Sequence, residues 1–238
     1  MGKLLENYNC IITGGTGQLG MEVVKAFVKE GARVFLNYRD EKKFEQLQKE
    51  VGATGQLEGA PADLADELQV RRFFREFHEQ YQQLDALLHL AGGFWMGGRV
   101  ADTPLAQWRR MLEINLETAF LCMREAFCLM QEQGHGKIFT VSSKNAVELP
   151  PQMGAYATAK AALLTLSEIM AKEGKEYNIR VNCILPSIID TPANRQGMPK
   201  ADFQKWVSPA EIGNLLIQLC RPEAGSLSQT ALKVYGQV

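Results

Sequence analysis

The chain has 238 residues, of which 46% are hydrophobic and 22% charged, and its 26 basic and 27 acidic residues leave a formal net charge of -1. This composition lies in the ordinary globular range and excludes a disordered chain, a collagen-like repeat and a coiled-coil rod. The near-neutral charge gives no sign of a nucleic-acid or membrane-surface partner, and no apolar run is long enough to span a membrane.

Strands and helices are predicted to alternate along the chain. Short apolar runs predict strands at 9–12, 33–36, 55–59, 86–90, 137–141, 179–185 and 231–235. Helical periodicity lies between them at 18–29, 41–50, 64–81, 104–133 and 155–176, with further helical stretches near 201 and at 209–220. Strands that are separated by helices and apolar throughout predict a doubly wound α/β fold of Rossmann type, with a mostly parallel seven-stranded sheet. Since no linker or repeat interrupts the series, we expect a single domain over residues 1–238.

A glycine-rich segment lies between the first strand and the first helix. Glycines placed there let the backbone turn tightly, approach a pyrophosphate and aim helix N-terminal amides at it. A plain turn is the alternative. The position after a strand and before a helix favours a dinucleotide site, formed by Gly14, Thr16, Gly17, Gln18, Leu19 and Gly20.

The end of the second strand bears on the choice between the two nicotinamide dinucleotides. An acidic residue there would bind a ribose 2′-hydroxyl, but the chain has Asn37 and Arg39, with Lys42 and Lys43 close behind. A guanidinium suits a 2′-phosphate, so the sequence favours NADP over NAD. A solvated basic loop is the alternative interpretation.

Four polar residues form the candidate catalytic set. Tyr156 and Lys160 are four residues apart, a spacing that places them on one face of a helix. An ammonium beside a phenol favours the phenolate and moves the tyrosine toward the working pH range. Ser143 lies thirteen residues before Tyr156, at the carboxyl end of a strand, and Asn115 lies among apolar neighbours in the middle of a predicted helix.

In their order and spacing these motifs resemble the short-chain dehydrogenase/reductase family, from residue 9 to about 236. The resemblance implies an NAD(P)-dependent oxidoreductase acting on a small carbonyl or alcohol substrate. Tyr156 would donate a proton to the substrate oxygen while the nicotinamide delivers hydride, and Ser143 would hold that oxygen. Lys160 would lower the pKa of Tyr156 and bind nicotinamide-ribose hydroxyls. Asn115 would order a water that leads from Lys160 to solvent.

The resemblance also implies contacts to the cofactor beyond the glycine loop. Asp63, followed by Leu64, matches the family position that contacts adenine, and positions after the sixth strand match those that hold the nicotinamide carboxamide. Together with Asn37 and Arg39, the implied cofactor residues are Asp63, Leu64, Ala91, Gly92, Tyr156, Lys160, Pro186, Ile189 and Thr191.

Several positions depart from the family pattern. Gln18 replaces the middle glycine of the loop, and the resulting glycine spacing looks like that of a longer, sugar-nucleotide-modifying branch. That branch needs a sizeable C-terminal substrate domain, for which 238 residues leave no room. The strand-end asparagines of the family are replaced by His89 and Leu90, and Ser187 follows Pro186 where the family has glycine.

The segments 94–98, 147–153 and 191–206 are expected to surround the substrate, the last of them as a short lid. The first two are largely apolar and suit a flat ring or an acyl chain, although packing or a subunit contact is an equal alternative. The first segment and the end of the chain also resemble dihydropteridine reductase, which lacks the catalytic serine that Ser143 would supply. A protein that senses NAD(P) without turnover is a further alternative, but such a sensor has no reason to keep all four catalytic residues.

The oligomeric state and the cellular location of the protein are predicted from weaker sequence features. Apolar residues spread widely around the helix at 155–176, and the family commonly pairs through this helix, so a homodimer or homotetramer is expected. The five cysteines have no metal-ligand spacing, and Cys10 and Cys183 fall in apolar runs where buried reduced thiols are expected. No disulfide or metal site is predicted. Residues 1–9 lack the pattern of a signal peptide, which favours a cytoplasmic protein.

Overall fold

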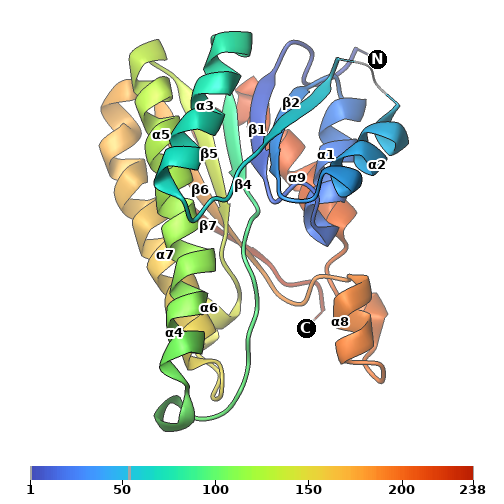
Figure 1. The fold of residues 1–238 in the computed structure, drawn as a ribbon, viewed down its shortest axis with the longest axis vertical. Helices are drawn as coiled ribbons and strands as arrows, with labels where there is room; N and C mark the ends of the chain where they lie inside the picture. Colours follow the sequence, from blue (N-terminus) through green and yellow to red (C-terminus); the bar gives the residue numbers. More distant parts are fainter. Residues whose placement is uncertain (1, 53–54, 238) are drawn as a thin grey trace.

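Seven parallel strands form one sheet in the order β3-β2-β1-β4-β5-β6-β7 (Figure 1). The computed structural model describes residues 2–52 and 55–237, so the two ends of the predicted domain at residues 1 and 238 lie outside the described residues. The strands are β1 Asn9–Thr13, β2 Arg33–Tyr38, β3 Leu57–Pro61, β4 Ala86–His89, β5 Gly136–Val141, β6 Ile179–Pro186 and β7 Thr230–Val234. The strand order changes direction between β1 and β4, and doubly wound sheets bind ligands at the carboxyl ends of the strands beside such a point.

Helices cover both faces of the sheet (Figure 1). They are α1 Gln18–Lys29, α2 Glu41–Val51, α3 Glu67–Tyr81, α4 Leu105–Leu112, α5 Thr118–Gln133, α6 Asn145–Glu148, α7 Gly154–Glu173, α8 Pro192–Gly197 and α9 Pro209–Cys220. Side chains of α1, α2 and α9 share one buried cluster with the sheet, and those of α3, α5 and α7 share the other. The predicted doubly wound, single-domain α/β fold is confirmed.

The strands are apolar throughout because each of their faces packs on a helical layer. In β1, Ile12 belongs to the cluster under α1 and α9, whereas its neighbour Ile11 belongs to the cluster under α3, α5 and α7. Both side chains are fully buried. This two-sided burial explains why the sequence shows continuous apolar runs rather than alternation.

Several predicted boundaries were wrong. The helix expected at 104–133 is interrupted by a π-helix, Glu113–Glu117. The third strand lies two residues later than predicted, and α3 begins at Glu67 because the Asp66 carboxylate accepts hydrogen bonds from the Leu68 and Gln69 amides. In place of one helical stretch near residue 201, the structure has α8 and a short 3-10 turn, Phe203–Lys205.

Among the described residues, no helix is long and apolar enough to cross a membrane. All five cysteines carry free thiols; Cys10, Cys122, Cys183 and Cys220 are buried and Cys128 is exposed. The buried reduced thiols predicted at Cys10 and Cys183 are confirmed.

Candidate active site

Close backbone contacts shape the glycine loop between β1 and α1. Gly14 has a φ of +68°, which favours glycine, and its carbonyl oxygen accepts a hydrogen bond of 2.9 Å from the Gly17 amide. A Cβ on Gly20 would overlap that carbonyl oxygen and lie 2.7 Å from Gly15 Cα. A side chain is therefore excluded at Gly20, whereas Gln18, in the place of the family's middle glycine, is the exposed first residue of α1.

The N-terminus of α1 has no side-chain cap. Its N-cap residue is Gly17, whereas the caps of α2, α3 and α9 are the side chains of Asp40, Asp66 and Ser208. The first amides of a helix need acceptors, and a phosphate is a suitable one. The loop and helix therefore fit a dinucleotide pyrophosphate.

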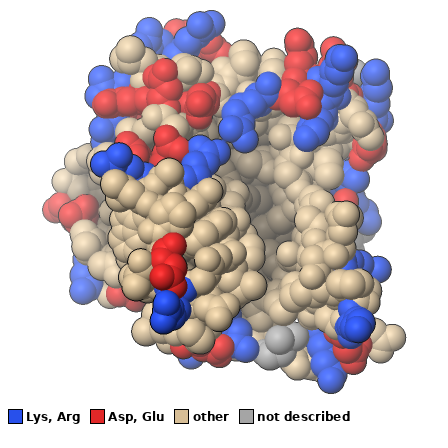
Figure 2. All heavy atoms as spheres, turned by 60° about the horizontal axis from the view of Figure 1, so that its bottom comes forward, with Lys and Arg blue, Asp and Glu red and all other residues tan. Residues whose placement is uncertain are grey.

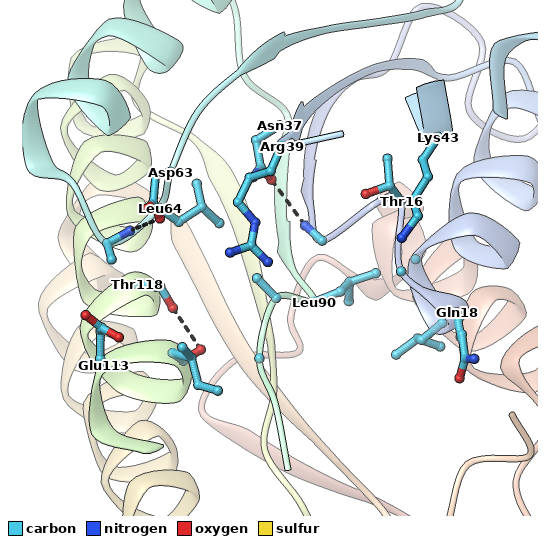
Figure 3. A pocket seen from close by; sticks show the side chains of 18 of the residues that line it. Thr16, Gln18, Asn37, Arg39, Lys43, Asp63, Leu64, Leu90, Glu113 and Thr118 are labelled. Carbon is cyan, nitrogen blue, oxygen red and sulfur yellow. Dashed lines mark hydrogen bonds between the residues drawn. The ribbon is translucent and has the colours of Figure 1, made fainter. Parts of the chain in front are cut away.

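A cavity of about 550 Å³ lies beside this loop, with α4 and α5 on its other side (Figure 3). Thirteen of the predicted cofactor residues line it: Gly14, Thr16, Gly17, Gln18, Leu19, Gly20, Asn37, Arg39, Asp63, Leu64, Ala91, Gly92 and Thr191. Four predicted cofactor residues are not among the lining residues: Tyr156, Lys160, Pro186 and Ile189. Pro186 lies at the end of β6, and Ile189 forms a bridge with Val207.

Two cations, Arg39 after β2 and Lys43 in α2, line the cavity. Arg39 projects its guanidinium between the two walls, and the Lys43 side chain approaches from the side of Thr16 (Figure 3). Asn37 is buried and joins two segments, since its Oδ1 accepts from the Gly14 amide at 3.2 Å and its Nδ2 donates to the Ala62 carbonyl at 3.3 Å. Positions 37–39, where a carboxylate would bind a ribose 2′-hydroxyl, carry none, and the carboxylate of Asp40 that follows caps α2.

The far wall of the cavity includes residues that were not predicted as site residues. Arg110 forms an ion pair of 2.7 Å with Glu113, and both line the cavity with Ile114 and Thr118. The spacing of four between Arg110, Ile114 and Thr118 could have indicated a shared helix face. That signal is common to most amphipathic helices and did not point to a ligand. The remaining lining residues outside the predicted set are Lys43, Ala65 and Leu90.

Asn115 lies in the π-helix and is fully buried. Its Oδ1 accepts from the Gly93 amide at 3.0 Å, and its Nδ2 donates to the Met111 carbonyl at 3.1 Å. These bonds explain a polar residue among apolar neighbours. They also tie the π-helix to the segment that follows β4, which carries Gly92 on the cavity wall.

Lys160 lies on α7, behind the cavity wall at Gly92. Its side chain is buried, and Nζ donates to the Val141 carbonyl at 2.8 Å. A methyl group placed on Gly92 would come within 2.8 Å of Asn115 Oδ1 and 3.1 Å of Lys160 Nζ, so the amide and the ammonium both lie directly behind this glycine. Burial lowers the pKa of Lys160 to about 8.

Tyr156 lies one turn before Lys160 on α7, and its hydroxyl is close enough to the Ser143 hydroxyl for that side chain to lower the Tyr156 pKa. Burial raises the pKa of Tyr156, and the Ser143 hydroxyl opposes that rise. The lowering of the Tyr156 pKa by Lys160 that the sequence suggested is not seen, since the ammonium donates instead to Val141. Of the four predicted catalytic residues, Ser143 thus lies beside Tyr156, whereas Asn115 and Lys160 lie behind the same residue of the cavity wall, Gly92.

His89 occupies a position where the family has asparagine. Its Nδ1 is 2.9 Å from Thr13 Oγ1, so the side chain joins the ends of β4 and β1. Burial, together with the charge of Lys160, lowers the pKa of His89 to about 3, so this imidazole is neutral at physiological pH.

Comparison with known proteins decides the family. A family model described as short chain dehydrogenase matches residues 9–201. The chain belongs to the short-chain dehydrogenase/reductase family. Its membership confirms the resemblance inferred from the motifs, and it makes the chain an NAD(P)-dependent oxidoreductase.

Individual members of the family are similar over most of this short-chain dehydrogenase/reductase. The NADP-dependent (R)-specific alcohol dehydrogenase of Lentilactobacillus kefiri is 31% identical over 185 residues, 76% of this chain and 73% of that protein. The rhamnolipid-biosynthesis 3-oxoacyl-[acyl-carrier-protein] reductase of Pseudomonas aeruginosa is 26% identical over 95% of this chain and 94% of its own length. A solved short-chain dehydrogenase/reductase from Serratia marcescens matches with a TM-score of 0.90 at 29% identity, covering 98% of both chains.

Proposed function

We propose that this enzyme transfers hydride between NADP and a carbonyl or alcohol substrate at Tyr156. The observation that carries the proposal is the proximity of the Ser143 and Tyr156 hydroxyls, one helical turn from a buried lysine behind the cavity wall. A hydroxyl pair and a buried ammonium are the groups that proton transfer to a carbonyl oxygen requires.

The roles of the side chains follow from their positions. In the reducing direction Tyr156 donates its phenolic proton to the carbonyl oxygen, and Ser143 donates a hydrogen bond that stabilises the developing charge. Lys160, whose ammonium lies behind Gly92, would bind the nicotinamide-ribose hydroxyls, and Asn115 holds the Gly93 backbone beside it. The bound dinucleotide supplies the hydride.

The cavity residues would hold that dinucleotide. The amides at the start of α1 would hold the pyrophosphate, Asp63 and Leu64 would contact the adenine, and Pro186, Ile189 and Thr191 would hold the nicotinamide carboxamide. The overlap that excludes a side chain at Gly20 supports the close approach of loop and helix that this binding needs.

Replacing Tyr156 with phenylalanine tests the chemistry. The variant keeps the ring but has no proton to donate, so NADPH oxidation with a carbonyl substrate is expected to fall by roughly 10²–10⁴-fold while NADPH binding persists. Tyr177→Phe, on the turn that follows α7, is the matched control. Undiminished turnover in Tyr156→Phe would refute the assigned role.

The preference for NADP rests on Arg39 and Lys43 at the cavity. The Arg39→Ser variant is expected to weaken NADPH binding by roughly tenfold or more, as expected for a charge-assisted contact, and to leave NADH binding nearly unchanged. The control is Lys42→Ser, since Lys42 does not line the cavity. Equal losses for NADPH and NADH would argue for NAD as the natural cofactor.

A substrate panel separates the alternative functions. Ketones, quinones, acyl thioesters and a quinonoid dihydropterin would be tested with NADPH and NADH, following cofactor oxidation. Reduction of the pterin alone would support the dihydropteridine-reductase-like alternative. Tight NADPH binding without turnover of any substrate would support the NAD(P)-sensing alternative.

We also infer a homodimer or homotetramer in a reducing, cytoplasmic setting, with residues 191–206 acting as a lid. Ile169 on α7 and Phe120 on α5 are 48% and 42% exposed, which is consistent with a partner on this helical face. Five free thiols are consistent with a reducing compartment. Sedimentation of dilute protein tests the assembly, and a stable monomer would contradict it.

A further inference from the structure

Phe94 contacts the ring of the proposed proton donor. The ring centroids of Phe94 and Tyr156 are 5.0 Å apart at an interplanar angle of 77°, which is an edge-to-face arrangement. The two residues are 62 positions apart in the sequence. Phe94 nevertheless remains 59% exposed, so much of its ring faces open space beside Tyr156.

The segment that carries Phe94 is fixed to the catalytic residues. The preceding amide, that of Gly93, donates to Asn115 Oδ1 at 3.0 Å. Further along, the Gly97 amide donates to the Gln152 carbonyl at 3.3 Å, which joins this segment to the loop before α7. Phe94 is therefore held in place from both sides rather than being carried on a free loop.

Exposed apolar side chains lie on the segment of Phe94 and on the segment hydrogen-bonded to it. The two segments joined at Gly97 and Gln152 also carry Met96, Val147 and Leu149, which are 52%, 43% and 66% exposed. Exposed large apolar side chains gathered on neighbouring segments indicate a binding surface. Figure 2, which views the lower end of Figure 1, shows a hollow between largely uncharged walls, with most charged side chains around the rim.

Cations on the surrounding loops are engaged with neighbouring carboxylates. Arg99 pairs with Asp102 at 2.8 Å, and Lys144 pairs with Glu148 at 3.4 Å. Arg195, at the lid, forms two bonds of 2.6 and 2.7 Å with Asp190. These ion pairs neutralise charge close to the walls of the hollow. Apolar contact is therefore the main interaction that the walls provide to a substrate.

The reacting carbonyl fixes where the rest of a substrate lies. Its oxygen must come within hydrogen-bond range of the Tyr156 hydroxyl, about 2.6–3.2 Å. The Phe94 ring, whose centroid is 5.0 Å from that of Tyr156, would then border the space taken by one substituent of the carbonyl carbon. A flat apolar group can stack on that ring or meet its edge, whereas a saturated ring of equal size lacks the flat face that such a contact needs.

We propose that Phe94 is a specificity-determining residue that selects ketones with a planar apolar group, such as an aryl ring, on the carbonyl carbon. The inference rests on the proposed function of Tyr156. In the reducing direction the carbonyl carbon gains hydride from NADPH, its oxygen gains the Tyr156 proton, and the products are the secondary alcohol and NADP. The phenolic proton is then replaced from solvent.

The test compares acetophenone with cyclohexyl methyl ketone, which has the same number of carbons in a non-planar ring, and with butan-2-one. We expect the wild-type enzyme to reduce acetophenone with a kcat/KM at least about fivefold above that of cyclohexyl methyl ketone. Phe94→Leu, which stays apolar but loses the ring, should lower the acetophenone value by about 3- to 10-fold, the effect of one aromatic pair. The change should lie mainly in KM, because the contact is made in the ground state as well as in the transition state.

Phe94→Tyr is the matched control, because it keeps the ring and should keep the preference for acetophenone. NADPH affinity and the unfolding temperature should be the same in all three proteins, which excludes misfolding as the cause. A wild-type enzyme that reduces none of the carbonyls in the wider panel overturns the proposed function, and this inference with it. Reduction of ketones without preference for the planar one, or equal losses for both cyclic ketones in Phe94→Leu, overturns this inference alone.

Discussion

Replacing Gly20 with alanine is expected to damage the dinucleotide site. The new Cβ would overlap the Gly14 carbonyl oxygen and lie 2.7 Å from Gly15 Cα and 2.8 Å from the Gly14 carbonyl carbon. Carbon atoms in good contact are about 3.5–4.0 Å apart, so α1 and the loop would have to separate by roughly 1 Å. The amides at the start of α1 and the loop backbone could then no longer surround the same pyrophosphate.

The size of the effect follows from this overlap. Forcing one additional carbon into a packed site costs about 1–3 kcal/mol. For a chain of this length that loss lowers the unfolding temperature by roughly 2–12 °C. Cofactor binding loses hydrogen bonds as well as geometry, so we expect the NADPH Kd to rise at least about tenfold, or about 1.4 kcal/mol.

Titration calorimetry with NADPH and thermal unfolding measure the two effects. Gly213→Ala is the matched control, because Gly213 also lies in a helix, α9, and its Cβ would sit an ordinary 3.5 Å from Ala26 Cβ. Alanine is the better helix former by up to about 1 kcal/mol, so the control should be as stable as the wild type or more so, with unchanged Kd. A Gly20→Ala protein that binds NADPH normally and unfolds at the wild-type temperature would refute the close-approach argument.

Two further predictions concern the buried residues behind the cavity. Burial lowers the pKa of Lys160 to about 8, so this side chain is protonated below that pH. Because reduction consumes a proton, kcat/KM for NADPH should be level below about pH 8 and fall above it. His89→Asn should leave this break in place, because His89, with a pKa of about 3, is neutral throughout, and loss of the break would contradict the assignment to Lys160. Asn115→Leu leaves the Gly93 amide and the Met111 carbonyl without their partners, which should cost about 2 kcal/mol or more and lower the unfolding temperature by roughly 4–8 °C in a calorimetric scan. An unchanged unfolding temperature would show that these two bonds contribute nothing.

The sheet could be predicted because its strands are buried on both faces and so appear as unbroken apolar runs. The glycine loop could also be predicted, because close approach between backbone segments requires glycine at the contact. The boundaries of the helices were harder to predict. A π-helix has nearly the same local periodicity as an α-helix, and the chain from 104 to 133 therefore looked continuous around Asn115.

The site was predictable in its residue types but not in its contacts. Tyr156 and Lys160 are neighbours in sequence, and their spacing on one helix face could be inferred directly. The contact of Phe94 with Tyr156, and the bond from the Gly93 amide to Asn115, join segments that meet only through the tertiary fold. The bond from Lys160 to the Val141 carbonyl, which draws the ammonium away from the phenol, also has no sequence signature.

The π-helix has a consequence for how this chain can vary. A residue advances an α-helix by about 100°, and the wider turn at Glu113–Glu117 holds one residue more than a regular turn would. Deleting a residue there would restore regular hydrogen bonding but would rotate all of α5 about its axis. Ala119, Cys122, Ala126 and Met130, which now face the sheet, would turn away from it. The rotation of α5 about its axis and the placement of Asn115 behind Gly92 are thus set by the same turn, and neither can be altered without the other.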